Sequence, residues 1–165
     1  MEPIGIEPIR EAHVEGFHAA LDTVARERRY LSFLEAPPLE GTRDFVQDNI
    51  RNGHPQFVAL AEGRVVGWCD IRRHPREVHA HRGTLGMGII PGYRERGLGR
   101  RLITATIDAA RAQGLHRIDL DVHADNLRAR ALYEKVGFVE EGIARDGVRI
   151  DGRFIDVVQM GLLLS

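Results

Sequence analysis

Apolar residues recur at two spacings along the chain, and the spacing distinguishes the expected helices from the expected strands. Val14, Phe17 and Leu21 follow one another at three- and four-residue intervals, which is typical of a helix with one buried face. Thr42 has the side chain of an N-cap residue, so we expect a second helix to begin there, after a proline-rich loop over 35–41. The four predicted helices cover residues 12–28, 42–52, 98–113 and 127–136.

Runs of β-prone residues between turn signals predict the strands. Prolines flank the first run, which suits an edge strand because proline cannot donate a ladder hydrogen bond. Glu62-Gly63 and Asp151-Gly152 each separate two such runs and are typical of two-residue hairpin turns. The seven predicted strands cover residues 4–9, 56–61, 64–72, 81–90, 117–122, 138–150 and 153–164.

The predicted elements follow one another in the order β, α, α, β, β, β, α, β, α, β, β. Such a mixed order predicts an α/β fold with a central sheet of about seven strands, mostly antiparallel, and about four helices on its faces. The chain has 165 residues, which is the size of one domain, so we expect a single domain over 1–165.

Composition excludes several classes of protein. Lys and Arg total 23 and Asp and Glu total 24, so a net charge of −1 gives no general attraction to nucleic acids or membrane surfaces. No apolar stretch approaches about 18 residues and no secretory signal is recognisable, so we expect a soluble, cytoplasmic protein. Cys69 is the only cysteine, which excludes an intrachain disulfide and a multi-cysteine metal site.

The segment 89–102 has the pattern of a phosphate-binding turn, because a strand runs into a glycine-rich turn that opens directly into a long helix. Gly97 and Gly99 let the backbone approach a bound group, and the free N–H groups of a helix start attract anions. A turn with solvated arginines is the alternative that the glycine spacing leaves open. Four arginines surround the turn: Arg94, Arg96, Arg100 and Arg101.

Two motifs resemble the hallmarks of a known superfamily. The segment Arg94-Glu95-Arg96-Gly97-Leu98-Gly99 fits the pattern R/Q-x-x-G-x-G/A and follows a strand that ends in apolar-x-Pro. The segment from Asn126 to Phe138 fits a second pattern, N-x-x-A-x-x-L-Y-x-K-x-G-F. Both resemble motifs of the GNAT superfamily of N-acetyltransferases, and the predicted order of elements matches that fold over essentially the whole chain.

This resemblance implies one N-acetyltransferase domain with the acyl-CoA N-acyltransferase fold. It implies an enzyme that moves an acetyl group from acetyl-CoA to a primary amine of a small molecule or an amino acid, by direct attack in a ternary complex. A protein N-terminal acetyltransferase of the ribosomal-protein type and a non-catalytic acyl-CoA-binding sensor or subunit remain open. We expect no metal and no nucleic-acid or membrane partner, and a homodimer is compatible with the family.

The resemblance also implies roles for the residues of the donor site. In such enzymes the strand before the turn binds the pantetheine arm through its backbone, which corresponds here to Met87, Gly88 and Ile89, with a bulge in the glycine-rich strand 83–88. The Ile89 N–H would bind the acetyl carbonyl and stabilise the oxyanion. The residues expected to bind the pyrophosphate are Arg94, Glu95, Arg96, Gly97, Leu98, Gly99 and Arg100.

Two residues of the second motif have implied roles. Asn126 would bind the pantetheine region, although it also suits a helix N-cap. Tyr133 lies seven residues further on and shares a helix face with Asn126. By resemblance it would protonate the departing thiolate as a general acid. Without the motif, a tyrosine on an amphipathic helix would be interpreted as a core residue.

No motif assigns the general base or the acceptor site. Asp121 is our first choice for the base, acting through ordered water, among the titratable residues on or beside the central strands: Asp70, Glu77, His79, His81 and Asp121. Cys69 is expected to be a buried structural thiol rather than a nucleophile. Tyr30, Phe33 and Trp68 are expected to line an apolar wall of the acceptor pocket, with core packing as the alternative.

Overall fold

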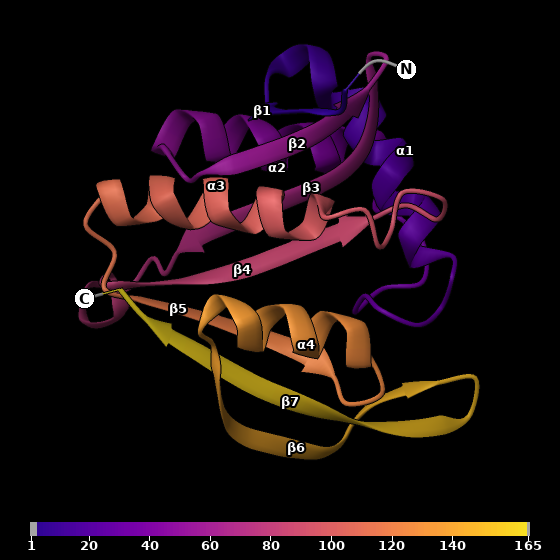
Figure 1. The fold of residues 1–165 in the computed structure, drawn as a ribbon, viewed down its shortest axis with the longest axis vertical. Coiled ribbons are helices and arrows are strands. Elements are labelled where there is room, and N and C mark those ends of the chain that lie inside the picture. The colour runs from indigo at the N-terminus through magenta and orange to yellow at the C-terminus, as the bar shows by residue number, and fades with distance from the viewer. Residues whose placement is uncertain (1–2, 165) are drawn as a thin grey trace.

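The computed structural model describes residues 3–164, which form one seven-stranded sheet with helices on both faces (Figure 1). The strands are β1 (Gly5–Pro8), β2 (Gln56–Ala61), β3 (Arg64–Arg73), β4 (Arg82–Ile89), β5 (Arg117–His123), β6 (Val139–Ile150) and β7 (Arg153–Leu163). The helices are α1 (Val14–Ala25), α2 (Leu39–Asn52), α3 (Leu98–Ala112) and α4 (Leu127–Val136). The predicted fold class is confirmed.

The two central strands β4 and β5 separate soon after they begin. The strand order is β1-β2-β3-β4-β5-β7-β6, and among the described strands β4 and β5 form the single parallel pair. Their pairing ends at Thr84↔Asp119, whereas β4 stays paired with β3 up to Ile89 and β5 stays paired with β7 up to His123. The sheet therefore opens into a V between β4 and β5, which Figure 1 shows clearly.

The helices form two layers. On one face, α3 packs over β2, β3 and β4, and α4 lies beside it over the β5–β7 half of the sheet (Figure 1). On the other face, α1 and α2 pack together, and the Phe17 ring of α1 meets the Trp68 indole of β3 with centroids 5.5 Å apart. Within residues 3–164, no helix has both the length and the apolar character that crossing a bilayer would need.

The two predicted hairpin turns are confirmed. Glu62 and Gly63 have φ of +50° and +81°, and Asp151 and Gly152 have φ of +53° and +76°. Positive φ at both central residues defines the type I′ turn, whose twist matches that of the strands it joins. The turn at Asp151-Gly152 pairs Ile150 with Arg153 and starts the long β6–β7 hairpin.

The first two helices differ from the prediction at their ends. α1 ends at Ala25, and Arg28 takes a left-handed φ of +57°, which no helix can include. α2 begins at Leu39 rather than at Thr42, because extended Pro38 is the N-cap and its carbonyl already accepts hydrogen bonds from Gly41 and Thr42. Thr42 is thus inside the helix and buried, and it is not a cap.

Two further expectations for the sheet are wrong. The bulge expected over 83–88 does not occur against β3, because the register between β3 and β4 runs without a shift up to Ile89. A register shift occurs instead in β2, between Ala59 and Leu60. β4 is also one residue shorter at each end than the predicted strand 81–90, because it begins at Arg82 and ends at Ile89.

Gly88 of β4 makes room for a neighbouring side chain. A Cβ atom built on Gly88 would lie 2.5 Å from the Trp68 ring, which is closer than any carbon contact allows. Trp68 of β3 is directly opposite Gly88 and is buried on the α1 face of the sheet. Glycine at this position therefore lets the indole lie across β4 beside the V.

We predict that Gly88→Ala lowers the free energy of unfolding by about 1–3 kcal/mol, because the added methyl group must displace the Trp68 ring. Gly5→Ala is the matched control, since a Cβ at this other strand glycine would meet nothing within 4 Å. Urea denaturation measures both variants. Equal stabilities would contradict the packing of Trp68 against Gly88.

Candidate active site

The V between β4 and β5 opens into a cavity of about 810 Å³, a size typical of ligand-binding pockets. It extends from the N-terminus of α3, past the end of β4, to the loop that follows α1. α4 contributes the remaining wall. Its lining therefore comes from five separate parts of the chain: Val24 of α1 and residues 30–33, 84–89, 94–100 in part, and 121–135 in part.

The edge of β4 that faces this cavity has free hydrogen-bonding groups. The Ile90 N–H donates to Val66 of β3 at 3.0 Å, so Gly86 and Gly88 also direct their N–H groups toward β3. The N–H groups of Met87 and Ile89 therefore point the other way, into the V, where β5 no longer pairs with β4. An extended ligand can bind there as an added strand would.

The turn before α3 is an anion-binding cradle. Gly97 is the N-cap, with φ of +79°, and the first bond within the helix runs from the Arg101 N–H to the Gly97 carbonyl at 3.2 Å. The preceding N–H groups of the first turn, which include those of Gly99 and Arg100, therefore lack partners within the helix. The first turn holds no acidic residue, so the positive end of the helix dipole is not offset.

The two glycines of this turn are needed for different reasons. Gly97 takes a left-handed φ, which L side chains adopt only with strain. Gly99 has an ordinary φ, but a Cβ there would lie 2.9 Å from a methyl carbon of Leu132 on α4. The second glycine thus allows the close approach of α3 to α4 at the mouth of the V.

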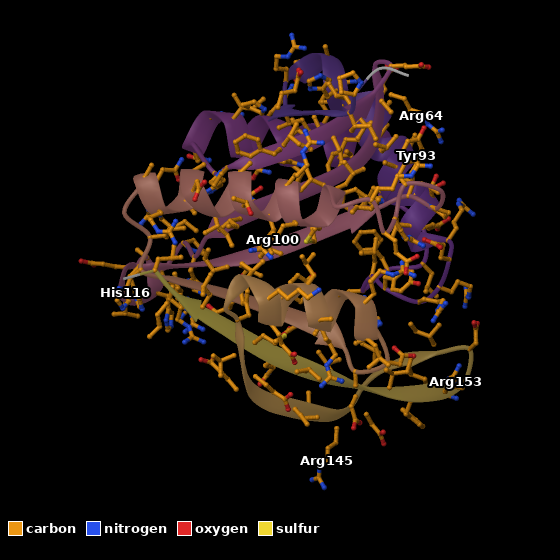
Figure 2. All side chains as sticks on the ribbon, in the orientation of Figure 1. Arg64, Tyr93, Arg100, His116, Arg145 and Arg153 are labelled. Carbon is orange, nitrogen blue, oxygen red and sulfur yellow. The ribbon has the colours of Figure 1, made fainter. Side chains whose placement is uncertain are left out.

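The arginines around the turn do not act as one group. Arg100 lies in the space between α3 and α4 (Figure 2) and lines the cavity. The Arg94 guanidinium also lines it but is paired with Glu27, lies 5.0 Å from the Tyr30 ring centroid and donates to the Ile89 carbonyl at 2.8 Å. Arg94 therefore connects the turn to the α1–α2 loop, and its charge is already neutralised.

Other residues predicted at this turn differ in their positions. Arg96 lies over the Tyr93 ring at 5.2 Å, and the Leu98 side chain is buried in the core. Neither lines the cavity, whereas Glu95 does.

Arg128 and Lys135 of α4 also line the cavity, and the sequence reasoning missed them. Their seven-residue spacing places them on one face of the helix and could have indicated this role.

Asn126 and Tyr133 lie together on the cavity side of α4, as predicted. The Asn126 side chain caps the helix by accepting a hydrogen bond from the Ala129 N–H at 3.2 Å. Tyr133 is 7% exposed and packs against Phe138, with ring centroids 5.8 Å apart. Burial raises the pKa of the Tyr133 hydroxyl above its ordinary value, so this group keeps its proton at neutral pH.

The loop after α1 forms the wall opposite the donor cradle. Tyr30 and Phe33 line the cavity, and their place in an acceptor pocket stays a prediction. Two contacts hold this loop: the His123 ring bonds the Arg29 carbonyl at 2.8 Å, and Arg28 pairs with Asp151 of the β6–β7 turn at 2.5 Å. Trp68, by contrast, is 3% exposed in the core and is not among the residues that line the cavity.

The candidate bases occupy very different environments. Asp121 of β5 is exposed and lines the cavity, while Glu77 and His79 lie on a 3₁₀ turn outside it. Asp70 of β3 is only 8% exposed, and its carboxylate faces Gly86, a residue of the cavity wall. Burial raises the pKa of Asp70 to about 7, an effect that Arg72 partly opposes.

The thiol and the histidines take no part in the cavity wall. Cys69 is fully buried, as expected, and burial raises the pKa of its thiol above the ordinary value, so it stays protonated and unreactive. Within the part of the chain that the structure describes, no three His, Cys, Asp or Glu residues come together as a metal site. The prediction that the reaction needs no metal stays a prediction.

Known proteins match this chain over most of its length. The model of the acetyltransferase (GNAT) family matches residues 17–138. N-alpha-acetyltransferase RimI of Mycobacterium tuberculosis is 37% identical over 60% of this chain and 61% of its own length. L-amino acid N-acetyltransferase AaaT of Escherichia coli is 27% identical over 92% of this chain and 94% of its own. The chain thus spans less than two thirds of RimI but almost all of AaaT.

Solved structures have the same fold. A GNAT-family acetyltransferase from Streptococcus pneumoniae is 29% identical, with a TM-score of 0.92 over 98% of this chain and 100% of that one. The structure of yncA from Salmonella typhimurium with its cofactor acetyl-CoA is 18% identical, with a TM-score of 0.93 over 99% of this chain and 95% of that one. These matches confirm the acyl-CoA N-acyltransferase fold.

We predict that Asp70→Asn stabilises the protein more at pH 8 than at pH 5. The unfolded carboxyl ionises near pH 3.8 but the folded one only near pH 7, so the cost of burying the charge grows as the pH rises between these values. The stability difference between the variant and the wild type should shift by at most about 2–3 kcal/mol from pH 5 to pH 8. Urea unfolding at both pH values measures it, and a shift of zero would mean that Asp70 titrates like an exposed residue.

Proposed function

The chain belongs to the acetyltransferase (GNAT) family, and we propose that it transfers the acetyl group of acetyl-CoA to a primary amine of a small molecule or an amino acid. The proposal rests on the continuity of one cavity. This cavity joins the cradle at α3 to the loop after α1, and the unpaired edge of β4 lies between these two ends. An acyl donor entering at one end and an amine entering at the other would meet at the end of β4.

The donor end suits acetyl-CoA. Free N–H groups at the start of α3 would bind the pyrophosphate, with Arg100 adding positive charge. The N–H groups of Met87 and Ile89 would bind the pantetheine arm, and Asn126 lies across the V from them. The acetyl-CoA held by the Salmonella typhimurium protein of the same fold supports this assignment.

The chemistry needs an oxyanion donor and a leaving-group acid. We assign the Ile89 N–H to the acetyl carbonyl, where it would stabilise the negative charge of the tetrahedral intermediate. Tyr133 holds its proton at neutral pH and lines the same cavity, so it would give that proton to the departing thiolate. A binding module without turnover would not need this acid, which favours an enzyme over a sensor.

The acceptor end suits a small amine more than a protein. The loop carrying Tyr30 and Phe33 is fixed to β5 and to the β6–β7 turn by the His123 and Arg28 contacts, and it forms one wall of the cavity. The match to AaaT over almost its whole length supports an amino acid acceptor. RimI is more similar in sequence over a shorter match, so transfer to a protein N-terminus is the second candidate.

The location of the protein in the cell and its oligomeric state stay proposals. A cytoplasmic location agrees with a lone buried thiol that forms no disulfide. A homodimer stays a prediction that light scattering in solution would test.

The acceptor is identified by measuring thiol release from acetyl-CoA across a panel of amines. The panel contains the twenty L-amino acids, L-methionine sulfone, spermidine and a peptide with a free N-terminal alanine. We expect release to be stimulated by at least one free amino acid. Stimulation by the peptide alone would favour the N-terminal acetyltransferase, and binding of acetyl-CoA without stimulation by any amine would contradict an enzyme of this class.

We predict that Tyr133→Phe lowers kcat by about 100-fold, because the thiolate then leaves without a proton donor. The hydroxyl is not needed to bind the donor, so the Kd for acetyl-CoA should stay within about twofold of the wild-type value. This is a change in binding free energy of well under about 1 kcal/mol. Steady-state kinetics and calorimetry provide the two values. Unchanged kcat would exclude Tyr133 as the acid.

We predict that Gly97→Asp raises the Kd for acetyl-CoA by about tenfold or more, because a carboxylate at the N-cap of α3 repels the pyrophosphate. Gly97→Asn is the matched control, since it demands the same left-handed φ with a similar side chain and no charge. Calorimetry should show a much smaller change for the asparagine variant. Equal losses for both would attribute the effect to backbone strain and contradict the phosphate cradle.

A further inference from the structure

One buried carboxylate lies on the acceptor side of the V. Asp70 is directly opposite Gly86 in the β3–β4 pair, and a Cβ atom built on Gly86 would lie 3.6 and 3.9 Å from the two Asp70 carboxylate oxygens. Gly86 lines the cavity and immediately precedes Met87, the first residue whose N–H is free in the V. The missing side chain at Gly86 thus leaves Asp70 next to the strand on which the acetyl group would be bound.

The face of the sheet on which Asp70 lies is the one an amine would approach. Side chains at alternate positions of a strand share a face, so Asp70 points to the same side as Trp68, whose ring packs on Phe17 of α1. The loop with Tyr30 and Phe33 follows α1 on this side, whereas the cradle of α3 lies on the other. Asp70 is not itself among the residues that line the cavity, but its carboxylate lies on the acceptor face of the sheet, beside Gly86 of the cavity wall.

The Asp70 carboxylate has no structural partner, although the residue is only 8% exposed. No hydrogen bond or ion pair between residues 3 and 164 satisfies it, although nearly all buried carboxylates are paired. Arg72, the nearest cation on β3, is held by Asp48 of α2 at 2.5 Å. Asp70 therefore lies in an environment that stabilises its protonated form. No described residue accepts a hydrogen bond from that form.

The residue opposite Asp70 on β2 is also incompletely paired. Gln56 accepts a hydrogen bond from the Asn49 side chain at 2.8 Å, which leaves its own buried amide nitrogen without an acceptor among the described residues. The groups that surround Asp70 are thus Arg72 on its own strand, Asp48 on α2, Gln56 on β2 and glycine on β4.

We propose that Asp70 is the general base that takes the proton from the attacking amine, a role that rests on the proposed acetyl transfer. The amine nitrogen forms a bond to the acetyl carbon. The bond between that carbon and sulfur then breaks, and the electron pair of the broken bond goes to sulfur. One proton passes from nitrogen to the Asp70 carboxylate, directly or through one water, and the Tyr133 proton passes to the thiolate. Return of the proton from Asp70 to Tyr133 through solvent completes the cycle.

This assignment differs from the base that the sequence favoured. Asp121 lines the cavity but is exposed on β5, on the far arm of the V from the free N–H groups of β4. Asp70 is on the strand paired with β4 itself, and its burial raises its pKa to about 7, which suits a base working near neutral pH. The two carboxylates can be distinguished because each can be replaced by its amide.

The test compares Asp70→Asn, Asp121→Asn and, as a control on the exposed face of α3, Asp108→Asn. Two acceptors are used: the panel amine that the wild type acetylates fastest, and methoxyamine, whose much lower basicity keeps it uncharged over the pH range of the test, so that the profile reports the base and not the acceptor. We expect Asp70→Asn to lower kcat about 100-fold at pH 7 and to abolish the rise of kcat with pH that the wild type shows below pH 7. The Kd for acetyl-CoA should not change.

A second variant separates proton transfer from a structural role. In Asp70→Ala, added formate should restore part of the lost kcat by occupying the space of the missing carboxylate, and a structural role would give no such rescue. Retention of the wild-type pH profile in Asp70→Asn, or its loss in Asp121→Asn instead, would overturn the proposal. If the wild type acetylates no amine at all, acetyl transfer itself fails, and that outcome is distinct from an active Asp70→Asn enzyme.

Discussion

The active site depends on one constraint, which is that β4 and β5 pair for only three residues and then separate. Each strand is held by its other neighbour, β4 by β3 and β5 by β7, so the separation does not unfold either half of the sheet. It does leave a strand edge in the middle of the protein with free N–H groups at Met87 and Ile89. Unpaired backbone groups are costly when buried, and a ligand that binds as a strand satisfies them.

Glycines and one ion pair let the neighbouring elements pack around this opening. Gly99 lets α3 approach Leu132 of α4, and Gly88 leaves room for Trp68 on the acceptor face. The pair between Arg94 and Glu27 joins the donor turn to the segment before the acceptor loop. Donor and acceptor ends are therefore parts of one connected structure, on opposite faces of the sheet.

Local patterns predict the elements and the donor site well, because turns, caps and motif residues act on their sequence neighbours. The hairpin at Asp151-Gly152, the helix ended by Gly137 and the placement of Asn126 beside Tyr133 follow from such signals. Errors arise where a distant contact decides. Trp68 is in the core because Phe17 and Gly88 surround it, and Arg94 turns to Glu27, 67 residues away in sequence. The burial of Asp70 likewise depends on β2 and β4, the strands on either side of it, which no local pattern contains.

Hydrogen exchange at the edge of β4 shows whether acetyl-CoA binds there as an added strand. Amide exchange measured by NMR, with and without acetyl-CoA, distinguishes N–H groups that face the V from those already bonded to β3. We predict that acetyl-CoA slows exchange at Met87 and Ile89, while Gly86 and Gly88 are protected in both states because β3 already binds them. Unchanged exchange at Met87 and Ile89 in a protein saturated with acetyl-CoA would contradict it.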